Sequence, residues 1–76
     1  MKELVEAIAK VLVDHPEGVR GRAVEGEHAT VFELHTHPSD LGKVIGKRGR
    51  TAQAIRTILE GVGMKLRKLF ILEILD

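Results

Sequence analysis

The sequence contains no cysteine, no tryptophan and no tyrosine, and it has two prolines and two phenylalanines among its 76 residues. Without cysteine the chain has neither a disulfide framework nor a thiolate metal site. No apolar run approaches the length of a membrane-spanning helix, and no signal-peptide pattern is visible at the charged start of the chain. These absences predict a cytoplasmic protein that folds around an ordinary apolar core.

The composition describes a small folded chain. Hydrophobic residues make up 43% of the sequence, which is typical of a globular domain rather than a disordered segment. A chain of this length has room for one sheet and two or three helices. We therefore expect a single α+β domain over residues 1–76, without a separate substrate domain.

The apolar periodicity predicts helices and strands in the order helix, strand, strand, helix, helix, strand. We expect a three-stranded mixed sheet with the helices on one face. The expected ranges are 2–13 for the first helix, 19–25 and 29–36 for the hairpin strands, a short helix up to residue 45, a longer helix from residue 50, and 65–75 for the last strand.

The ends of these elements carry their own signals. Ser39 and Asp40 are residue types that cap a helix, so we expect them to cap the short helix. The longer helix is expected to end around Gly61 or Gly63, because glycine is preferred just past a helix terminus. The strand at 65–75 is apolar on both faces. It is therefore buried on both faces, or one face is available to a partner.

A basic glycine loop connects the two central helices. Gly46 and Gly49 bracket Lys47 and Arg48. Glycine tolerates positive φ and lets another backbone approach closely. The first N–H groups of the following helix have no partner within that helix and point towards the place where an anion would sit. The loop therefore predicts a site for a phosphate backbone.

The charge distribution supports this prediction. The net charge is only +1, but residues 1–40 hold four basic and eight acidic residues, whereas residues 41–76 hold eight basic and three acidic residues. A concentrated basic patch on a nearly neutral chain favours a local anionic ligand. The central cations, with no acidic residue among them, are Lys43, Lys47, Arg48, Arg50 and Arg56.

Two other phosphate-binding loops do not fit the spacing. The nucleotide-binding P-loop has four residues between its glycines and a Ser or Thr after its lysine. Here three residues separate Gly42 from Gly46, and Arg48 follows Lys47. The G-x-G-x-x-G fingerprint of dinucleotide-binding folds is absent.

His35, Thr36, His37 and Pro38 look like the start of the H-[ST]-H-P zinc motif of JAMM metallo-isopeptidases. The further ligands of that motif would fall on Gly46 and Gly49, which cannot bind zinc. We therefore expect no metal and no cofactor. No nucleophile with an adjacent base is present either, so we expect no enzymatic activity.

The loop and its flanks resemble the signature of the KH domain, a G-x-x-G clamp that holds about four nucleotides of single-stranded nucleic acid. Val44 and Ile45 precede the loop, and Arg50, Thr51 and Ala52 follow it. The predicted element order matches the type II topology, α-β-β-α-α-β. Residues 13–16, 40–52, 54–57 and 72–76 are similar to small bacterial KH proteins of the KhpA type.

This resemblance implies a cytoplasmic single-stranded RNA-binding protein that acts in post-transcriptional regulation or as an RNA chaperone, with roles in cell shape and cell wall biogenesis. It also implies a homodimer, or a heterodimer with a KhpB/Jag-type RNA-binding partner. The residues expected to contact RNA are Lys43, Ile45, Gly46, Lys47, Arg48, Gly49, Arg50, Gln53 and Arg56.

Two alternative functions stay open at the level of sequence. A helix-hairpin-helix element also places a glycine turn before a helix of small residues, and it would prefer duplex DNA. A pure interaction module using the strand at 65–75 would not need the cations of the loop. Arg20 and Arg22 are predicted to share one strand face, where they either extend the basic surface or are simply exposed to solvent.

Overall fold

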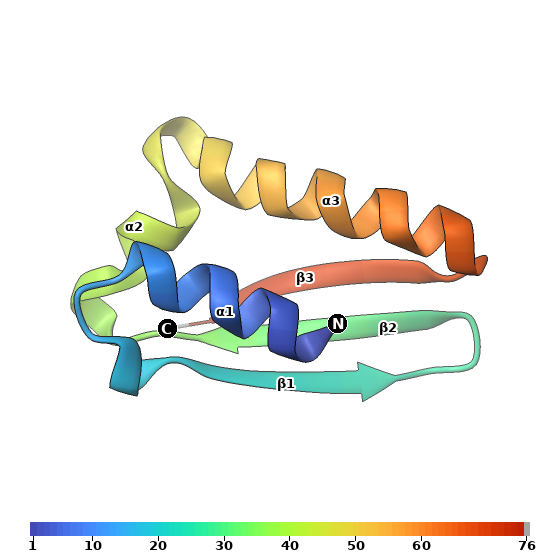
Figure 1. Ribbon diagram of the computed structural model, residues 1–76, viewed down its shortest axis with the longest axis horizontal. Helices are drawn as coiled ribbons and strands as arrows, with labels where there is room; N and C mark the ends of the chain where they lie inside the picture. Colours follow the sequence, from blue (N-terminus) through green and yellow to red (C-terminus); the bar gives the residue numbers. More distant parts are fainter. Residues whose placement is uncertain (76) are drawn as a thin grey trace.

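The computed structural model describes residues 1–75 and confirms the predicted order of helices and strands (Figure 1). Three short 3-10 turns lie between the main elements, at Pro16–Gly18, Pro38–Asp40 and Lys47–Gly49. The main elements are α1 (Lys2–Leu12), β1 (Arg20–Glu25), β2 (Ala29–His35), α2 (Leu41–Ile45), α3 (Arg50–Leu66) and β3 (Leu69–Leu75).

The three strands form one mixed sheet in the order β1-β2-β3. The hairpin strands β1 and β2 are antiparallel, whereas β2 and β3 run parallel, joined by the crossover through α2 and α3. The helices cover one face of the sheet (Figure 1). The expected α+β fold, with a three-stranded mixed sheet and helices on one face, is confirmed.

The core lies between this covered face and the helices. Phe32 of β2 and Phe70 of β3 meet edge to face, with ring centroids 5.3 Å apart. The alternation of buried and less buried residues along β2 shows that one face of the strand points at the helices. The buried core residues are Val5, Ala9, Val13, Val19, Phe32, Leu34, Val44, Ile55, Leu59, Phe70 and Leu72.

The predicted end of the longer helix is wrong. Instead of ending around Gly61 or Gly63, α3 continues to Leu66, and β3 begins at Leu69 rather than at residue 65. Gly63 is buried inside the helix, and a Cβ there would overlap the carbonyl oxygen of Lys68. The glycine is therefore needed for close passage of the returning chain, not for the helix end.

Candidate nucleic-acid interface

The glycine loop has an unusual backbone at three of its four residues. Gly46 and Gly49 adopt positive φ angles of 79° and 74°, and Arg48 between them has a φ of 57°. The Gly49 N–H donates to the Gly46 carbonyl oxygen over 3.0 Å, which closes the turn. Lys47 and Arg48 are exposed at its tip. The two cations therefore project from the turn between α2 and α3.

The two glycines serve different purposes. A Cβ on Gly46 would overlap the side chain and the backbone nitrogen of Thr51, so the fold itself excludes any larger residue there. Gly49 has nothing within 4 Å of the position that a Cβ would occupy. Its positive φ still favours glycine, but the space beside it is open. A ligand backbone can approach the loop at Gly49 without meeting protein atoms.

Arg48 holds a conformation that costs a residue with a Cβ about 1–2 kcal/mol. It is one of two non-glycine residues with positive φ among residues 1–75, and the other is Arg67 at the far end of α3. Strained backbone at an exposed loop is often kept for function. At Arg48 the strain turns the chain so that neighbouring cations and both glycines share one tight loop.

The cations nearest the loop are not neutralised by the protein. Lys47, Arg48 and Arg50 are all exposed, and none forms an ion pair with another residue in the described part of the chain. The start of α3, with its partial positive charge, lies directly behind them. The structure thus gathers unpaired positive charge at one end of the molecule.

The other predicted contact residues divide between exposed and engaged side chains. Ile45 is 36% exposed at the end of α2, and Gln53 is exposed on the first turns of α3. Arg56 is half-buried and donates to the Leu72 carbonyl oxygen over 3.4 Å, which connects α3 to β3. Lys43 points away from the loop towards the end of α1, where its ammonium lies 2.7 Å from an Asp14 carboxylate oxygen.

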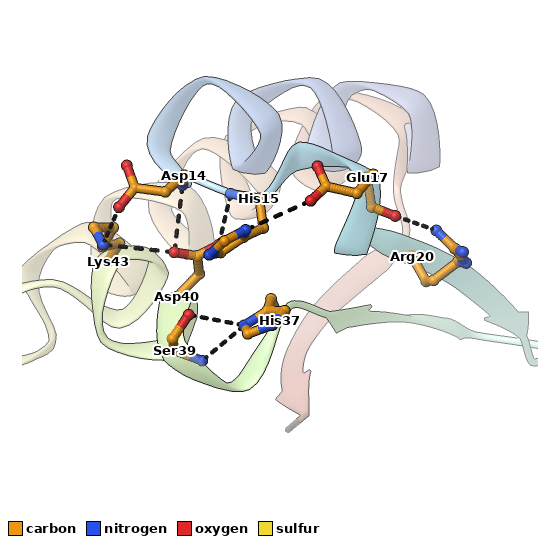
Figure 2. Close-up of polar contacts among 8 residues, drawn as sticks. All are labelled: Asp14, His15, Glu17, Arg20, His37, Ser39, Asp40 and Lys43. Atoms are coloured by element: carbon orange, nitrogen blue, oxygen red, sulfur yellow. Dashed lines mark hydrogen bonds and ion pairs between the residues drawn. The ribbon is translucent and has the colours of Figure 1, made fainter.

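Asp40 anchors the segment that leads into the loop, and sequence reasoning missed this role. It precedes α2, but its carboxylate does not cap that helix. Its side chain is fully buried and accepts hydrogen bonds from the backbone N–H groups of Asp14 (3.3 Å) and His15 (2.9 Å). Figure 2 shows these bonds with the ion pair that Asp40 makes to Lys43 at 3.5 Å. The end of α1 is thereby tied to the start of α2.

These contacts shift two pKa values in the directions expected for a stable ion pair. Burial raises the pKa of Asp40, but the N–H groups of His15 and Asp14 and the nearby positive charges outweigh burial and hold it below its usual value. The hydrogen bond to Asp14 is the largest cause that raises the pKa of Lys43. Lys43 therefore contributes to the position of α2 more directly than to a free basic surface.

The histidines take part in the same junction. The rings of His15 and His37 stack with centroids 4.3 Å apart. The His37 Nδ1 accepts from the Ser39 N–H over 3.2 Å and lies 2.8 Å from the Ser39 hydroxyl (Figure 2). Within residues 1–75 no group of three or more metal-ligating side chains comes together. The predicted cap residue Ser39 is instead bound by a histidine two positions earlier.

The arginines of β1 are also engaged by the protein. Arg20 donates to the carbonyl oxygens of Glu17 and Val19, and Arg22 forms an ion pair with Glu33 at 3.7 Å. Most of the Lys and Arg side chains that lack an ion pair among residues 1–75 lie on the loop, along α3 or in the turn after it, whereas Lys10 lies on α1.

Of the helices in the described range, none is both long enough and apolar enough to cross a bilayer.

The fold and the loop together define a class. The sheet order, the helix pair and the G-x-x-G turn with two cations at its tip are those of a type II KH domain. A family model described as "KhpA/KhpB, KH domain" matches residues 2–74. The chain belongs to this family.

Curated relatives cover the whole chain. The RNA-binding protein KhpA of Aquifex aeolicus (strain VF5) is 51% identical over 76 residues, which is 100% of this chain and 96% of the relative. The RNA-binding protein KhpA of Clostridium perfringens (strain 13 / Type A) is 52% identical over 75 residues, which is 99% of this chain and 100% of the relative. A third, from Borreliella burgdorferi, is 49% identical over 74 residues, covering 97% of this chain and 90% of the relative.

Proposed function

We propose that this protein binds single-stranded RNA and that the loop from Gly46 to Gly49 holds the phosphate backbone. The observation that carries the proposal is the pairing of exposed, unpaired Lys47 and Arg48 with the open space beside Gly49. The cations make charge-assisted contacts to phosphates, and the glycine lets the strand pass close to the loop backbone. Arg50 extends the cationic path into α3.

Side chains beside the loop then face the bases. Ile45 and Ala54 offer exposed apolar surface, and Gln53 and Arg56 carry groups that can hydrogen-bond base edges. The chain lacks tryptophan and tyrosine, so the aromatic stacking that strengthens many single-strand binders is missing. Binding is therefore expected to be of modest affinity, weakly sequence-selective and strongly salt-dependent.

Duplex DNA binding is the weaker alternative. A helix-hairpin-helix element needs no sheet, whereas here the helix pair packs on a mixed sheet in a chain of the KhpA/KhpB KH family. A pure interaction module is also disfavoured, because nothing in protein pairing requires unpaired cations at the tip of a strained loop. We therefore place single-stranded RNA first.

The decisive variant is the double charge reversal Lys47→Asp/Arg48→Asp. It is expected to weaken binding of a single-stranded RNA at least a hundredfold at low salt, because four units of charge change beside the phosphates. The matched control is Lys65→Asp/Arg67→Asp, which makes the same charge change at the other end of α3 and also places aspartate at a left-handed position. We expect the control to lose only a few-fold, with both variants folded by circular dichroism. Equal losses in the two variants would reject the loop as the site.

The proposal includes a second protein chain, either another copy or a KhpB/Jag-type partner. Apolar side chains are exposed on the sheet face away from the helices, where Val24 lies opposite Val31 and Val31 opposite Ile71. Others are exposed on the helices, including Val11 and Ile58. A second RNA-binding chain would raise avidity without new contacts to RNA.

Light scattering after size exclusion tests pairing and locates its surface. Ile71→Glu and Ile58→Glu each place a charge on one of the two apolar surfaces. We expect one of them, and not the other, to shift the protein or its complex with a KhpB/Jag-type protein towards monomer. A wild-type chain that stays monomeric at high concentration and ignores such a partner would reject the pairing. We place the activity in the cytoplasm, in post-transcriptional regulation.

A further inference from the structure

A pocket lies at the opposite end of α3 from the glycine loop. Its volume is about 300 Å³, and it opens between the start of α1, the turn end of the β1–β2 hairpin and the start of β3. The helix α3 has 17 residues, so the two ends are about 25 Å apart at 1.5 Å per residue. Figure 1 shows the glycine loop and the turn before β3 at opposite ends of the sheet.

The lining of this pocket combines two aromatic side chains with residues of both charges. Phe32 and Phe70, on the covered face of the sheet, contribute to it but are only 4% and 7% exposed. Lys2, Lys68 and Thr30 also line the pocket, and the Lys2 ammonium lies 3.9 Å from a Glu6 carboxylate oxygen. The acidic lining residues are Glu25 and Glu3, and the Glu3 carboxylate lies 3.8 Å from the N-terminal ammonium of Met1, which lines the pocket as well.

This combination fits a nucleobase better than a simple anion. A lone phosphate would face the carboxylates of Glu3 and Glu25 as well as the ammonium groups of Lys2, Lys68 and the N-terminus. A nucleotide offers an apolar ring to the exposed edges of the phenylalanines and a phosphate that a lysine can bind. Its exocyclic amino groups can donate hydrogen bonds to carboxylates, as cytosine N4 donates to Glu.

We propose that this pocket is a second nucleotide-binding site, which takes one base of the same single-stranded RNA that the glycine loop clamps. The proposal rests on the proposed RNA binding. At a rise of about 3.4 Å per stacked nucleotide, the 25 Å between the sites corresponds to about seven nucleotides. Added to the four or so held by the clamp, an RNA of about eleven nucleotides reaches both sites. A tetranucleotide held by the clamp does not reach the pocket.

The first test separates the pocket from the clamp by using single nucleotides. Nucleoside 5′-monophosphates are titrated into isotope-labelled Lys47→Asp/Arg48→Asp protein, in which the clamp is disabled, and amide resonances are followed by NMR. Resonances of Ala23, Thr30 and Phe70 are expected to shift in a saturable manner. In addition, Ala23→Leu is expected to abolish these shifts, because Ala23 is exposed on β1 and lines the pocket. The control Ala7→Leu enlarges an exposed alanine outside the lining and is expected to leave them unchanged.

The second test uses RNA length in the intact protein. An oligonucleotide of about twelve nucleotides is expected to lose about tenfold in affinity in Ala23→Leu, whereas a tetranucleotide binds wild type and variant equally. Absence of saturable shifts at the pocket, or equal effects of Ala23→Leu and Ala7→Leu, would overturn the second site. Loss of RNA binding in the clamp variant with retained pocket shifts would support both sites, so the two proposals fail separately.

Discussion

The two ends of α3 share two structural features, a tightly packed glycine and an arginine with positive φ, but these features have different roles at the two ends. At each end a glycine has no room for a side chain, Gly46 against Thr51 and Gly63 against the Lys68 carbonyl. Each end also holds an arginine in the left-handed region, Arg48 with φ 57° and Arg67 with φ 56°. In sequence the two segments are therefore similar, since each is basic and contains glycine.

The hydrogen bonds show how the ends differ. At the C-terminal end, the Lys68 N–H donates to the Gly63 carbonyl oxygen over 2.8 Å and the Arg67 N–H to that of Met64 over 3.3 Å. This is the Schellman arrangement, which ends a helix and reverses the chain. At the N-terminal end the space beside Gly49 is open, whereas the cations at both ends lack an ion-pair partner among residues 1–75. The backbone of one turn is used to end the helix, and the backbone of the other stays accessible to a ligand beside exposed cations.

Gly63→Ala is expected to have the largest effect on stability. The added Cβ overlaps backbone, which cannot move as a flexible side chain can, so we expect a loss of about 3 kcal/mol in the free energy of unfolding. The Cβ added by Gly49→Ala meets no atoms, so only the positive φ destabilises this variant, by about 1 kcal/mol. Urea unfolding measures the free energy of unfolding of both variants. Equal losses would contradict the distinction between a packed glycine and an open one.

Asp40→Asn is expected to have the next largest effect, because it weakens the junction between α1 and α2. The amide retains one acceptor for the N–H groups of Asp14 and His15 but loses the ion pair with Lys43. We expect the melting temperature to fall by about 5–10 °C and RNA binding to weaken, since α2 carries the loop. The salt dependence of binding should stay the same, because no phosphate contact is removed. A changed salt slope would mean that this junction touches RNA.

The junction also predicts how stability depends on pH. The folded pKa of Asp40 lies below its unfolded value of about 3.9. Its contribution is therefore fully present above that unfolded value and is lost as pH falls through the folded pKa. The pKa of Lys43 is raised, so its contribution is present below about pH 10.4 and is lost as pH rises through the folded pKa. Unfolding of Asp40→Asn, followed from pH 2 to 6, should show a weaker pH dependence than wild type.

A pair of smaller changes sharpens the comparison between the ends. Arg48→Gly and Arg67→Gly each relieve a left-handed conformation, so both are expected to raise the free energy of unfolding by up to about 1 kcal/mol. RNA binding should fall about five- to tenfold in Arg48→Gly and hardly at all in Arg67→Gly. Thermal unfolding and fluorescence anisotropy measure the two effects. Equal losses of RNA affinity would show that the arginines are interchangeable.

The smallest effect is expected at Gly61. This glycine is exposed within α3, and a Cβ there would meet nothing within 4 Å. Gly61→Ala should therefore stabilise the helix by about 0.5–1 kcal/mol and leave RNA binding unchanged. Destabilisation would mean that the helix is interrupted at this position.

The order of elements, the sheet and the glycine loop could be predicted from sequence because they depend on local signals. Apolar periodicity marks helices and strands, and the spacing of Gly46 and Gly49 around two cations marks the loop. The end of α3 could not be predicted, because a glycine looks the same whether it ends a helix or admits a close backbone. Gly63 is the second kind.

The contacts of Asp40 could not be predicted from the sequence for a different reason. Its partners Asp14 and His15 lie 26 and 25 residues away in the chain, so no local pattern reveals them. A capping role for Asp40 was the natural prediction from its neighbours, and the fold uses the carboxylate elsewhere. The ion pair between Lys43 and Asp14 spans 29 residues and was hidden in the same way. Long-range polar partners require the three-dimensional arrangement.

The most direct test of the clamp is the salt dependence of single-stranded RNA binding in wild type and in Lys47→Gln/Arg48→Gln. Each phosphate contact on a single strand contributes about 0.7 to the slope of log K against log salt. If the loop holds two phosphates, the slope of the variant should be shallower by about 1.4, with an unchanged fold by circular dichroism. Identical slopes would show that Lys47 and Arg48 do not contact phosphates and would contradict the account.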